Sequence, residues 1–260
     1  MSAGTDTEDV AGHATALRER GYTVFERAYD PSWVAVLRGE LEALYEALGR
    51  PPLHDPGHRE LAPGIQLCAA GLAVHSLLAQ RPAYASTLLR PAIVAAIREV
   101  LGDMVLEVAG CVISDRTRPF FAWHTHVGGV DDGVHRRRGV WPEVGGVERV
   151  MCLLYLQDVD DARGPMLVLP RAAGDPVALP YDHTLENWPG QVELRPPAGS
   201  VIAIEQCTWH AIRQMQGPGL RMFVGTTFAA RTTAPAGFVD AGLARYAAAS
   251  PLLASVVGDR

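Results

Sequence analysis

Residues 105–126 read VLEVAGCVISDRTRPFFAWHTH and contain two short β-rich runs on either side of a polar segment. The runs, residues 105–114 and 120–126, are rich in β-branched and aromatic residues, which favour strands. The segment between them contains Asp115 and Pro119, which are typical of turns. These two runs are followed by similar β-rich runs, and together they predict a mainly β core over residues 105–230. These further runs are residues 147–156, 166–169, 191–195, 200–205 and 221–230.

The chain before this core has a different pattern, and residues 14–104 are predicted to be mostly helical. A clear helix start lies at residues 30–32, Asp-Pro-Ser, after which apolar residues recur at helical spacing. The other elements expected here are a strand at residues 21–25, a Pro- and Gly-rich surface loop at residues 50–64 and helices around residues 69–79 and 91–101.

The two ends of the chain carry weaker signals. Residues 1–13 are polar and acidic and are expected to be disordered. Residues 235–260 predict a C-terminal helix, centred on residues 236–249. Since 260 residues suit one sizeable core, we expect a single domain over residues 1–260.

Composition and charge exclude several classes of partner. The net charge is −6, and the only dense basic run is at residues 135–138, so nucleic-acid binding is not indicated. No signal peptide and no membrane-spanning apolar stretch is recognisable. We therefore expect a cytoplasmic protein with a small-molecule substrate and without a membrane or nucleic-acid partner. The widely separated cysteines indicate reduced, buried thiols, at Cys68, Cys111, Cys152 and Cys207.

Two histidines near the end of the quoted stretch are candidate metal ligands. His124 and His126 are two apart on a predicted strand, so their side chains leave the same face. His210 follows a later strand and supplies a third imidazole. Three ligands on one face leave three positions of an octahedron open, which suits catalysis. The alternative is a half-buried strand whose histidines bond to backbone groups. No metal role is assigned to His54, His58 and His75.

The chain resembles the phytanoyl-CoA dioxygenase (PhyH-like) family of Fe(II)- and 2-oxoglutarate-dependent oxygenases over nearly its whole length. The resemblance lies in the order and spacing of four stretches rather than in identity with one protein. These are residues 21–31, Trp123-His124-Thr125-His126, residues 156–170, and Trp209-His210 through Arg221.

This resemblance implies a double-stranded β-helix, the jelly-roll fold of the cupin type, with Fe(II), 2-oxoglutarate and dioxygen as the reacting partners. The family motif is Trp-His-x-Asp, a later histidine completes the metal triad, and an arginine beyond it binds the distal carboxylate of 2-oxoglutarate. On this sequence these roles fall on His124, His210 and Arg221. A guanidinium suits the last role because it forms two parallel charged hydrogen bonds to a carboxylate.

His126 stands where the family has aspartate, and it makes the site one unit more positive. Four arrangements are compatible: an oxygenase with three histidines, a site where His126 is turned away and a halide or water binds, recruitment of Asp131 or Asp132, and a binder without catalysis. We favour the first, with His124, His126 and His210 as metal ligands and catalytic residues. A register shifted to His126-Val127-Gly128, as in halogenating members, is disfavoured because the family places tryptophan directly before the ligand.

Residues 127–146 are polar and Gly-rich, and they are too long for a hairpin turn. We expect a mobile flap at the mouth of the site. Within it Asp131, Arg137 and Trp141 are candidate substrate-binding residues, and a solvated loop is the competing interpretation.

The predicted function is oxidation of a small molecule in secondary metabolism, by hydroxylation or a related C–H oxidation. The alternatives are a non-catalytic or non-redox descendant that binds metal or ligand, a halogenase-like enzyme, and a three-histidine dioxygenase that works without 2-oxoglutarate. The last leaves Arg221 without an assigned partner.

Overall fold

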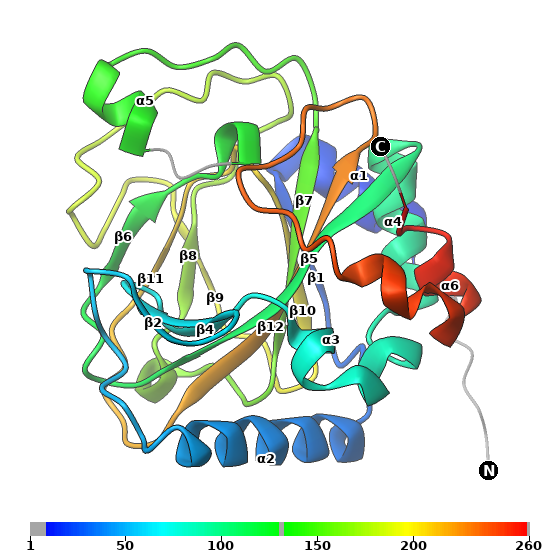
Figure 1. Cartoon of the computed structure of the whole chain (residues 1–260). Coiled ribbons are helices and arrows are strands. Elements are labelled where there is room, and N and C mark those ends of the chain that lie inside the picture. Colours follow the sequence, from blue (N-terminus) through cyan, green and yellow to red (C-terminus); the bar gives the residue numbers. More distant parts are fainter. Residues whose placement is uncertain (1–8, 130–132, 259–260) are drawn as a thin grey trace.

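The computed structural model describes residues 9–129 and 133–258, and its core is a pair of facing antiparallel sheets (Figure 1). The predicted mainly β core, a double-stranded β-helix, is confirmed. The larger sheet has the order β1 (Tyr22–Phe25), β10 (Val201–Glu205), β7 (Arg149–Tyr155), β12 (Arg221–Ala230), β5 (Met104–Ser114), β4 (Gly71–Val74), β3 (Ile65–Cys68) and β2 (Arg59–Ala62). The smaller sheet has the order β6 (Phe121–His124), β11 (His210–Ile212), β8 (Met166–Val168) and β9 (Val192–Leu194).

Several of the helices lie on the side of the larger sheet that faces away from the smaller one (Figure 1). Helix α1 (Val10–Arg20) packs against α4 (Pro91–Leu101), and both contact the sheet. The remaining helical segments are α2 (Pro31–Ala47), α3 (Leu77–Gln80), α5 (Gly133–Arg138), α6 (Pro251–Ala254) and the short 3-10 helices Pro82–Ser86, Val127–Gly129, Asp161–Arg163 and Leu243–Ala249.

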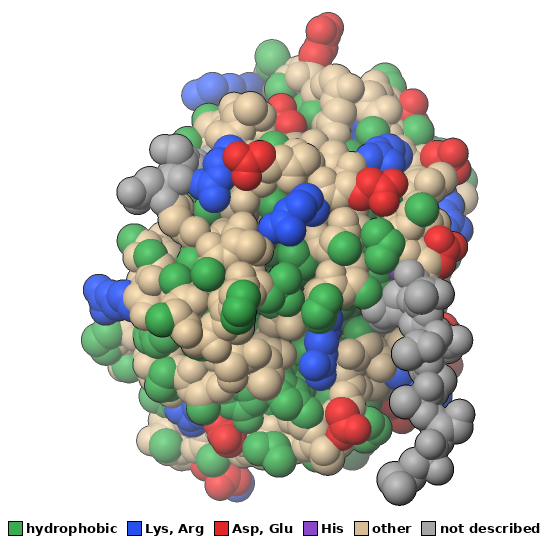
Figure 2. Space-filling view, turned by 90° about the vertical axis from the view of Figure 1, so that its right-hand side faces the viewer, with side chains coloured by type: hydrophobic (Ala, Val, Ile, Leu, Met, Phe, Trp, Pro, Cys, Tyr) green, Lys and Arg blue, Asp and Glu red, His purple; other side chains and the backbone are tan. Residues whose placement is uncertain are grey.

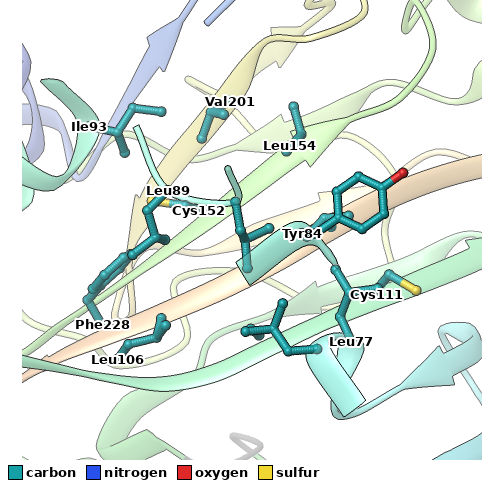
Figure 3. Packing of buried hydrophobic residues seen from close by; sticks show 14 of the residues in the cluster. Leu77, Tyr84, Leu89, Ile93, Leu106, Cys111, Cys152, Leu154, Val201 and Phe228 are labelled. Carbon is teal, nitrogen blue, oxygen red and sulfur yellow. The ribbon is translucent and has the colours of Figure 1, made fainter. Parts of the chain in front are cut away.

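Strand β12 shows how the two faces of the larger sheet are divided. Met222, Val224 and Phe228 belong to the apolar core beneath the helices. Figure 3 shows Phe228 in this layer, together with residues of the neighbouring strands and of α4. Arg221 and Phe223, whose side chains lie on the opposite face of the strand, line the space between the sheets. Because side chains alternate along a strand, one strand serves both the core and the site.

Residues 69–79 form the predicted helix only at their end, where α3 begins at Leu77. Residues 71–74 form β4, which pairs with β5 through Ala73 and Val112. All four β4 residues are buried, as expected for a strand covered on both faces, and periodicity alone does not separate such a run from a buried helix. Strands β2 and β3 likewise replace part of the loop predicted at residues 50–64 and the segment after it.

The expected disorder of residues 1–13 is wrong for its last part, and residues 1–8 lie outside the described residues. Helix α1 begins at Val10, because the Asp9 side chain accepts a hydrogen bond from Gly12 N at 2.8 Å. His13 Nδ1 lies 2.8 Å from Thr23 Oγ1, and its ring stacks on Phe25 at 3.9 Å. Tertiary contacts with β1 therefore fix this helix.

The predicted C-terminal helix over residues 236–249 forms only in its second half, from Leu243. The first half runs along β5 instead. Ala236 N donates to the Glu107 carboxylate at 3.0 Å, and Asp240 N donates to the Glu107 carbonyl at 2.8 Å. These bonds satisfy backbone groups that a helix would have used internally.

On the side of the molecule where α1 and α4 lie, acidic and basic side chains are interspersed and form no large patch of one charge (Figure 2). Within the described ranges, none of the helices combines the length and apolar character needed to cross a membrane.

A buried ion pair joins β5, β7 and the segment after β12. Arg149 Nε lies 2.8 Å from Glu107 Oε2, and neither side chain is more than 2% exposed. Arg149 also donates to the Ala234 carbonyl. Removal of one partner from such a pair leaves an uncompensated buried charge.

We predict that Glu107→Ala lowers the free energy of unfolding by about 3–5 kcal/mol, because Arg149 loses its counter-charge. Urea denaturation followed by circular dichroism measures this loss. The matched control is Asp103→Ala, which removes a surface ion pair with Arg231 and should cost much less. Equal losses in the two variants would contradict the assignment.

Candidate metal centre

Three histidine side chains meet between the two sheets. His124 ends β6, His210 begins β11, and the two are direct partners in the pairing of these strands. His126 lies just after β6, where its backbone N–H donates to the Gln206 carbonyl at 2.8 Å. The potential ligand nitrogens of the three lie within 4.8 Å of one another. The structure therefore brings together all three predicted ligands, although His126 lies beyond the strand end.

Backbone carbonyl groups orient two of the three rings. His124 Nδ1 lies 2.8 Å from the Ala122 carbonyl, and His210 Nδ1 lies 3.0 Å from the Thr208 carbonyl. A carbonyl oxygen can only accept, so each Nδ1 carries the proton, and each Nε2 keeps a free lone pair. This is the arrangement in which metal-binding histidines are usually held.

The same two rings are neutral at physiological pH. Burial, together with the neighbouring histidines, lowers the pKa of His124 well below its usual value. Burial and the nearby His126 lower the pKa of His210 to about 3. A metal ion binds neutral imidazole, so these rings release no protons when it binds.

A cavity of about 290 Å³ extends from the histidines between the sheets. Arg221, at the start of β12, lines this cavity and is 1% exposed. Its Nη2 donates to the Tyr155 hydroxyl at 2.9 Å, whereas its Nε has no hydrogen-bond partner among the described residues. The predicted carboxylate anchor thus shares one cavity with the histidines and retains a free donor.

Arg118 is a second buried arginine in this cavity, and the sequence did not single it out. Its side chain is 1% exposed, and none of its three guanidinium nitrogens has a hydrogen-bond partner in the described part of the chain. The guanidinium carbon lies 5.6 Å from the Phe121 ring centroid. Burial and the charge of Arg221 lower the pKa of Arg118 to about 9. In the sequence it is an ordinary turn residue, and its only signal is its place three residues before β6 begins.

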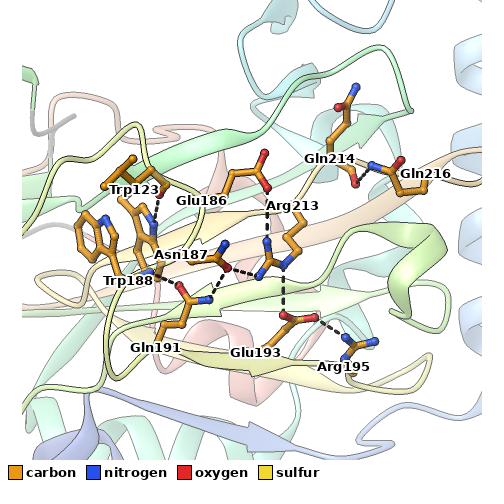
Figure 4. Close-up of polar contacts among 11 residues, drawn as sticks. Trp123, Glu186, Asn187, Trp188, Gln191, Glu193, Arg195, Arg213, Gln214 and Gln216 are labelled. Atoms are coloured by element: carbon orange, nitrogen blue, oxygen red, sulfur yellow. Dashed lines mark hydrogen bonds and ion pairs between the residues drawn. The ribbon is translucent and has the colours of Figure 1, made fainter.

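The outer face of the smaller sheet is braced by polar contacts around Arg213 (Figure 4). Arg213 follows β11 and donates to Asn187 Oδ1 at 2.8 Å and to Glu193 Oε2 at 3.1 Å. Trp123 Nε1 donates to the Leu185 carbonyl at 3.0 Å. These bonds tie the loop before β9 to the two strands that carry His124 and His210.

The predicted substrate-binding residues are not gathered at the cavity. The Trp141 ring lies 5.3 Å from the Trp209 ring, in an aromatic cluster on the outer side of the smaller sheet. Arg137 is exposed on α5, which stands away from the sheets (Figure 1). Asp131 lies outside the described residues, as does Asp132. Among the described cavity-lining residues, neither Trp141 nor Arg137 is present.

We predict that the metal-free protein loses stability as the pH falls from about 6.5 to 5. The folded pKa of His210, about 3, lies below its unfolded value, so the unfolded chain takes up the proton first. Each such histidine contributes a slope of about 1.4 kcal/mol per pH unit. Urea denaturation at several pH values should show a shallower slope for His210→Gln than for the wild type. Identical slopes would contradict the buried, neutral state of His210.

Comparison with known proteins agrees with this arrangement. The sequence profile of the phytanoyl-CoA dioxygenase (PhyH) family matches residues 17–223. Comparison with curated protein sequences gives no match.

Several solved structures share the fold. SnoK, an alpha-ketoglutarate-dependent carbocyclase from nogalamycin biosynthesis, is 18% identical with a TM-score of 0.61, covering 90% of this chain and 89% of SnoK. HygX from Streptomyces hygroscopicus, with nickel and 2-oxoglutarate bound, is 15% identical with a TM-score of 0.58, and the match covers 88% of this chain and 95% of HygX. AviO1 from Streptomyces viridochromogenes Tue57 is 18% identical with a TM-score of 0.62, and the match covers 88% of this chain and 98% of AviO1.

At these identities the structural likeness establishes the fold alone, whereas the family profile spans well over half of the sequence. The chain belongs to the phytanoyl-CoA dioxygenase family of Fe(II)- and 2-oxoglutarate-dependent oxygenases.

Proposed function

We propose that this protein oxidises a C–H bond of a small molecule in secondary metabolism, with Fe(II) held by His124, His126 and His210. The observation that carries the proposal is one cavity that contains three converging imidazoles and two buried arginines, neither of which has a carboxylate partner among the described residues. HygX binds nickel and 2-oxoglutarate on the same fold, and SnoK acts in nogalamycin biosynthesis, which supports both the cosubstrate and the metabolic setting.

The donor set fits a divalent metal. The Nε2 atoms of His124 and His210 are left free by their Nδ1 contacts, and the ring of His126 lies 5.2 Å and 5.3 Å from theirs, centroid to centroid. Imidazole suits iron, and three neutral ligands leave the full charge of the metal uncompensated. The site therefore favours anionic ligands in its remaining positions more than a site with one carboxylate does.

The buried charges of the protein support the proposal that the cosubstrate binds at the Arg118 and Arg221 end of the cavity. The buried carboxylates of Glu107 and Glu205 are already paired with Arg149 and Arg171. Neither Arg118 nor Arg221 has an ion-pair partner among the described residues. Buried cations without counter-charges are unfavourable, and a dicarboxylate such as 2-oxoglutarate supplies the missing charges.

The roles of the side chains follow from this charge distribution. Arg221, held by the Tyr155 hydroxyl, binds and orients the distal carboxylate. Arg118 lowers the free energy of the same dianion by its charge, and the apolar side chains of Leu153 and Phe223 exclude water from it. Bound Fe(II) supplies the redox chemistry that couples dioxygen reduction and 2-oxoglutarate decarboxylation to oxidation of the substrate.

We predict that anaerobic Fe(II)-loaded protein develops the visible charge-transfer band of a chelated keto acid when 2-oxoglutarate is added. Arg221→Ala should weaken the binding of 2-oxoglutarate about 100-fold, because a buried charge-assisted pair is lost. Arg116→Ala, an exposed arginine two residues before Arg118, is the matched control and should bind like the wild type. A wild type without the band would contradict the proposal.

A second prediction concerns the residue that departs from the family motif. His126→Ala should weaken Ni(II) binding, measured by calorimetry, at least about tenfold, because one of three ligands is lost. His126→Asp should retain Ni(II) binding. His135→Ala removes a histidine outside the cluster and should leave the affinity unchanged. Wild-type affinity in His126→Ala would show that His126 is not a ligand.

A further inference from the structure

Glycine interrupts the side-chain layer on the large-sheet wall of the cavity. Strands β5 and β12 pair so that their cavity-facing residues lie in rows, with one residue from each strand. The middle row carries no side chains. The backbone of residues 74–75 lies against its β5 member, Gly110, so the gap between the flanking rows is at its β12 member, Gly225. Counted away from Arg221, the rows are Phe223 with Val112, Gly225 with Gly110, and Thr227 with Val108.

The two positions hold glycine for different reasons. A Cβ atom at Gly110 would lie 2.6 Å from the Val74 carbonyl oxygen, so the close approach of β4 requires glycine there. A Cβ atom at Gly225 would lie 3.7 Å from Leu153 Cδ2 and 3.8 Å from Phe223 Cε2, which are ordinary contacts. Glycine inside a strand costs about 0.5–1 kcal/mol relative to alanine. Packing does not require glycine at position 225, and its effect is to keep cavity space open.

The gap and the carboxylate-binding end are separate parts of one cavity. Arg221 and Gly225 are four residues apart on β12, which corresponds to about 13 Å along a strand. Both face the cavity, because side chains on one face recur at every second residue. A cosubstrate bound by Arg221 therefore leaves the gap free for a second molecule.

The walls of the gap are uncharged. Leu153 pairs with Gly225 on β7, Val108 and Met151 lie in the next row, and Ala73 pairs with Val112 in the row on the other side. His75 also lines this part, and burial lowers its pKa, so it is neutral at pH 7. Among the described residues that line the cavity, the arginines Arg118 and Arg221 are the only charged side chains, and there is no carboxylate to pair with a cationic substrate.

We infer that the gap at Gly225 receives an apolar ring, and that the substrate of this enzyme is an uncharged carbocyclic or aromatic small molecule rather than a polycationic aminosugar. That the bound ring compound is a substrate rests on the proposed function. That the gap binds an apolar ring does not depend on it. A flat ring fits a site from which a side chain is missing, since both of its faces can contact apolar walls.

The test uses N-phenyl-1-naphthylamine, an uncharged aromatic fluorophore whose emission rises in apolar surroundings, with the full chain loaded with Ni(II) and 2-oxoglutarate. The wild type should bind the probe, Gly225→Leu should bind it at least tenfold more weakly, and Gly225→Ala should show a smaller loss. Gly39→Leu is the matched control, because Gly39 is exposed on α2, where an added Cβ atom would have no neighbour within 4 Å, and it should bind like the wild type. An excess of kanamycin A, a polycationic aminoglycoside, should not displace the probe.

The outcomes distinguish failure of this inference from failure of the proposed function. Equal probe affinity in Gly225→Leu and the wild type, no probe binding by the wild type, or displacement by kanamycin A would overturn the inference. If Gly225→Leu does not fold, as judged by thermal melting, the loss in Gly225→Ala decides instead. Calorimetric titration of the Ni(II) protein with 2-oxoglutarate is run in parallel. Absence of 2-oxoglutarate binding, with the probe result intact, would sink the proposed function and leave the apolar site established.

Discussion

The register between β6 and β11 is the constraint on which the site depends. His210 pairs directly with His124, and each histidine is preceded by a tryptophan, Trp209 and Trp123. Because side chains alternate, the two histidines face the larger sheet while the tryptophans face outward, where both contact Trp188. A slip of one residue in either strand would turn its histidine outward and place an indole where that imidazole lies. The aromatic layer thus fixes, from outside the cavity, the position of His124 and His210, the proposed metal ligands.

The buried charged residues include two kinds, those that form ion pairs within the scaffold and those that line the cavity. Glu107 with Arg149 and Glu205 with Arg171 are closed ion pairs that join strands to the segments beside them. Arg118 and Arg221 are equally buried but have no such partner in the described residues, and both line the cavity. A fold that retains two uncompensated cations in its interior loses stability for it, so their presence argues for an anionic ligand.

The replacement of the family's aspartate by His126 acts in the same direction. It places an imidazole where the family has a carboxylate, in a cavity that already holds two cations, so no negative charge is present among the described lining residues. Anionic cosubstrate at one end and an uncharged molecule at the gap beside Gly225 are the occupants that this distribution favours. This charge distribution is consistent with the two proposed binding regions of the cavity, one for the cosubstrate and one for the substrate.

The sequence alone determined the β core, the positions of its main strands along the chain and the three candidate histidines, because alternation, turn residues and the Trp-His motif are local signals. It also indicated Arg221, through its spacing from His210. Tertiary structure decided what local pattern could not. Residues 71–74 became β4 rather than a helix, and residues 236–242 followed β5, because in each case the partner strand supplied hydrogen bonds that no local pattern encodes. Arg118 and Gly225 gained their significance only when distant strands enclosed one cavity, since burial and empty space are properties of the packed chain.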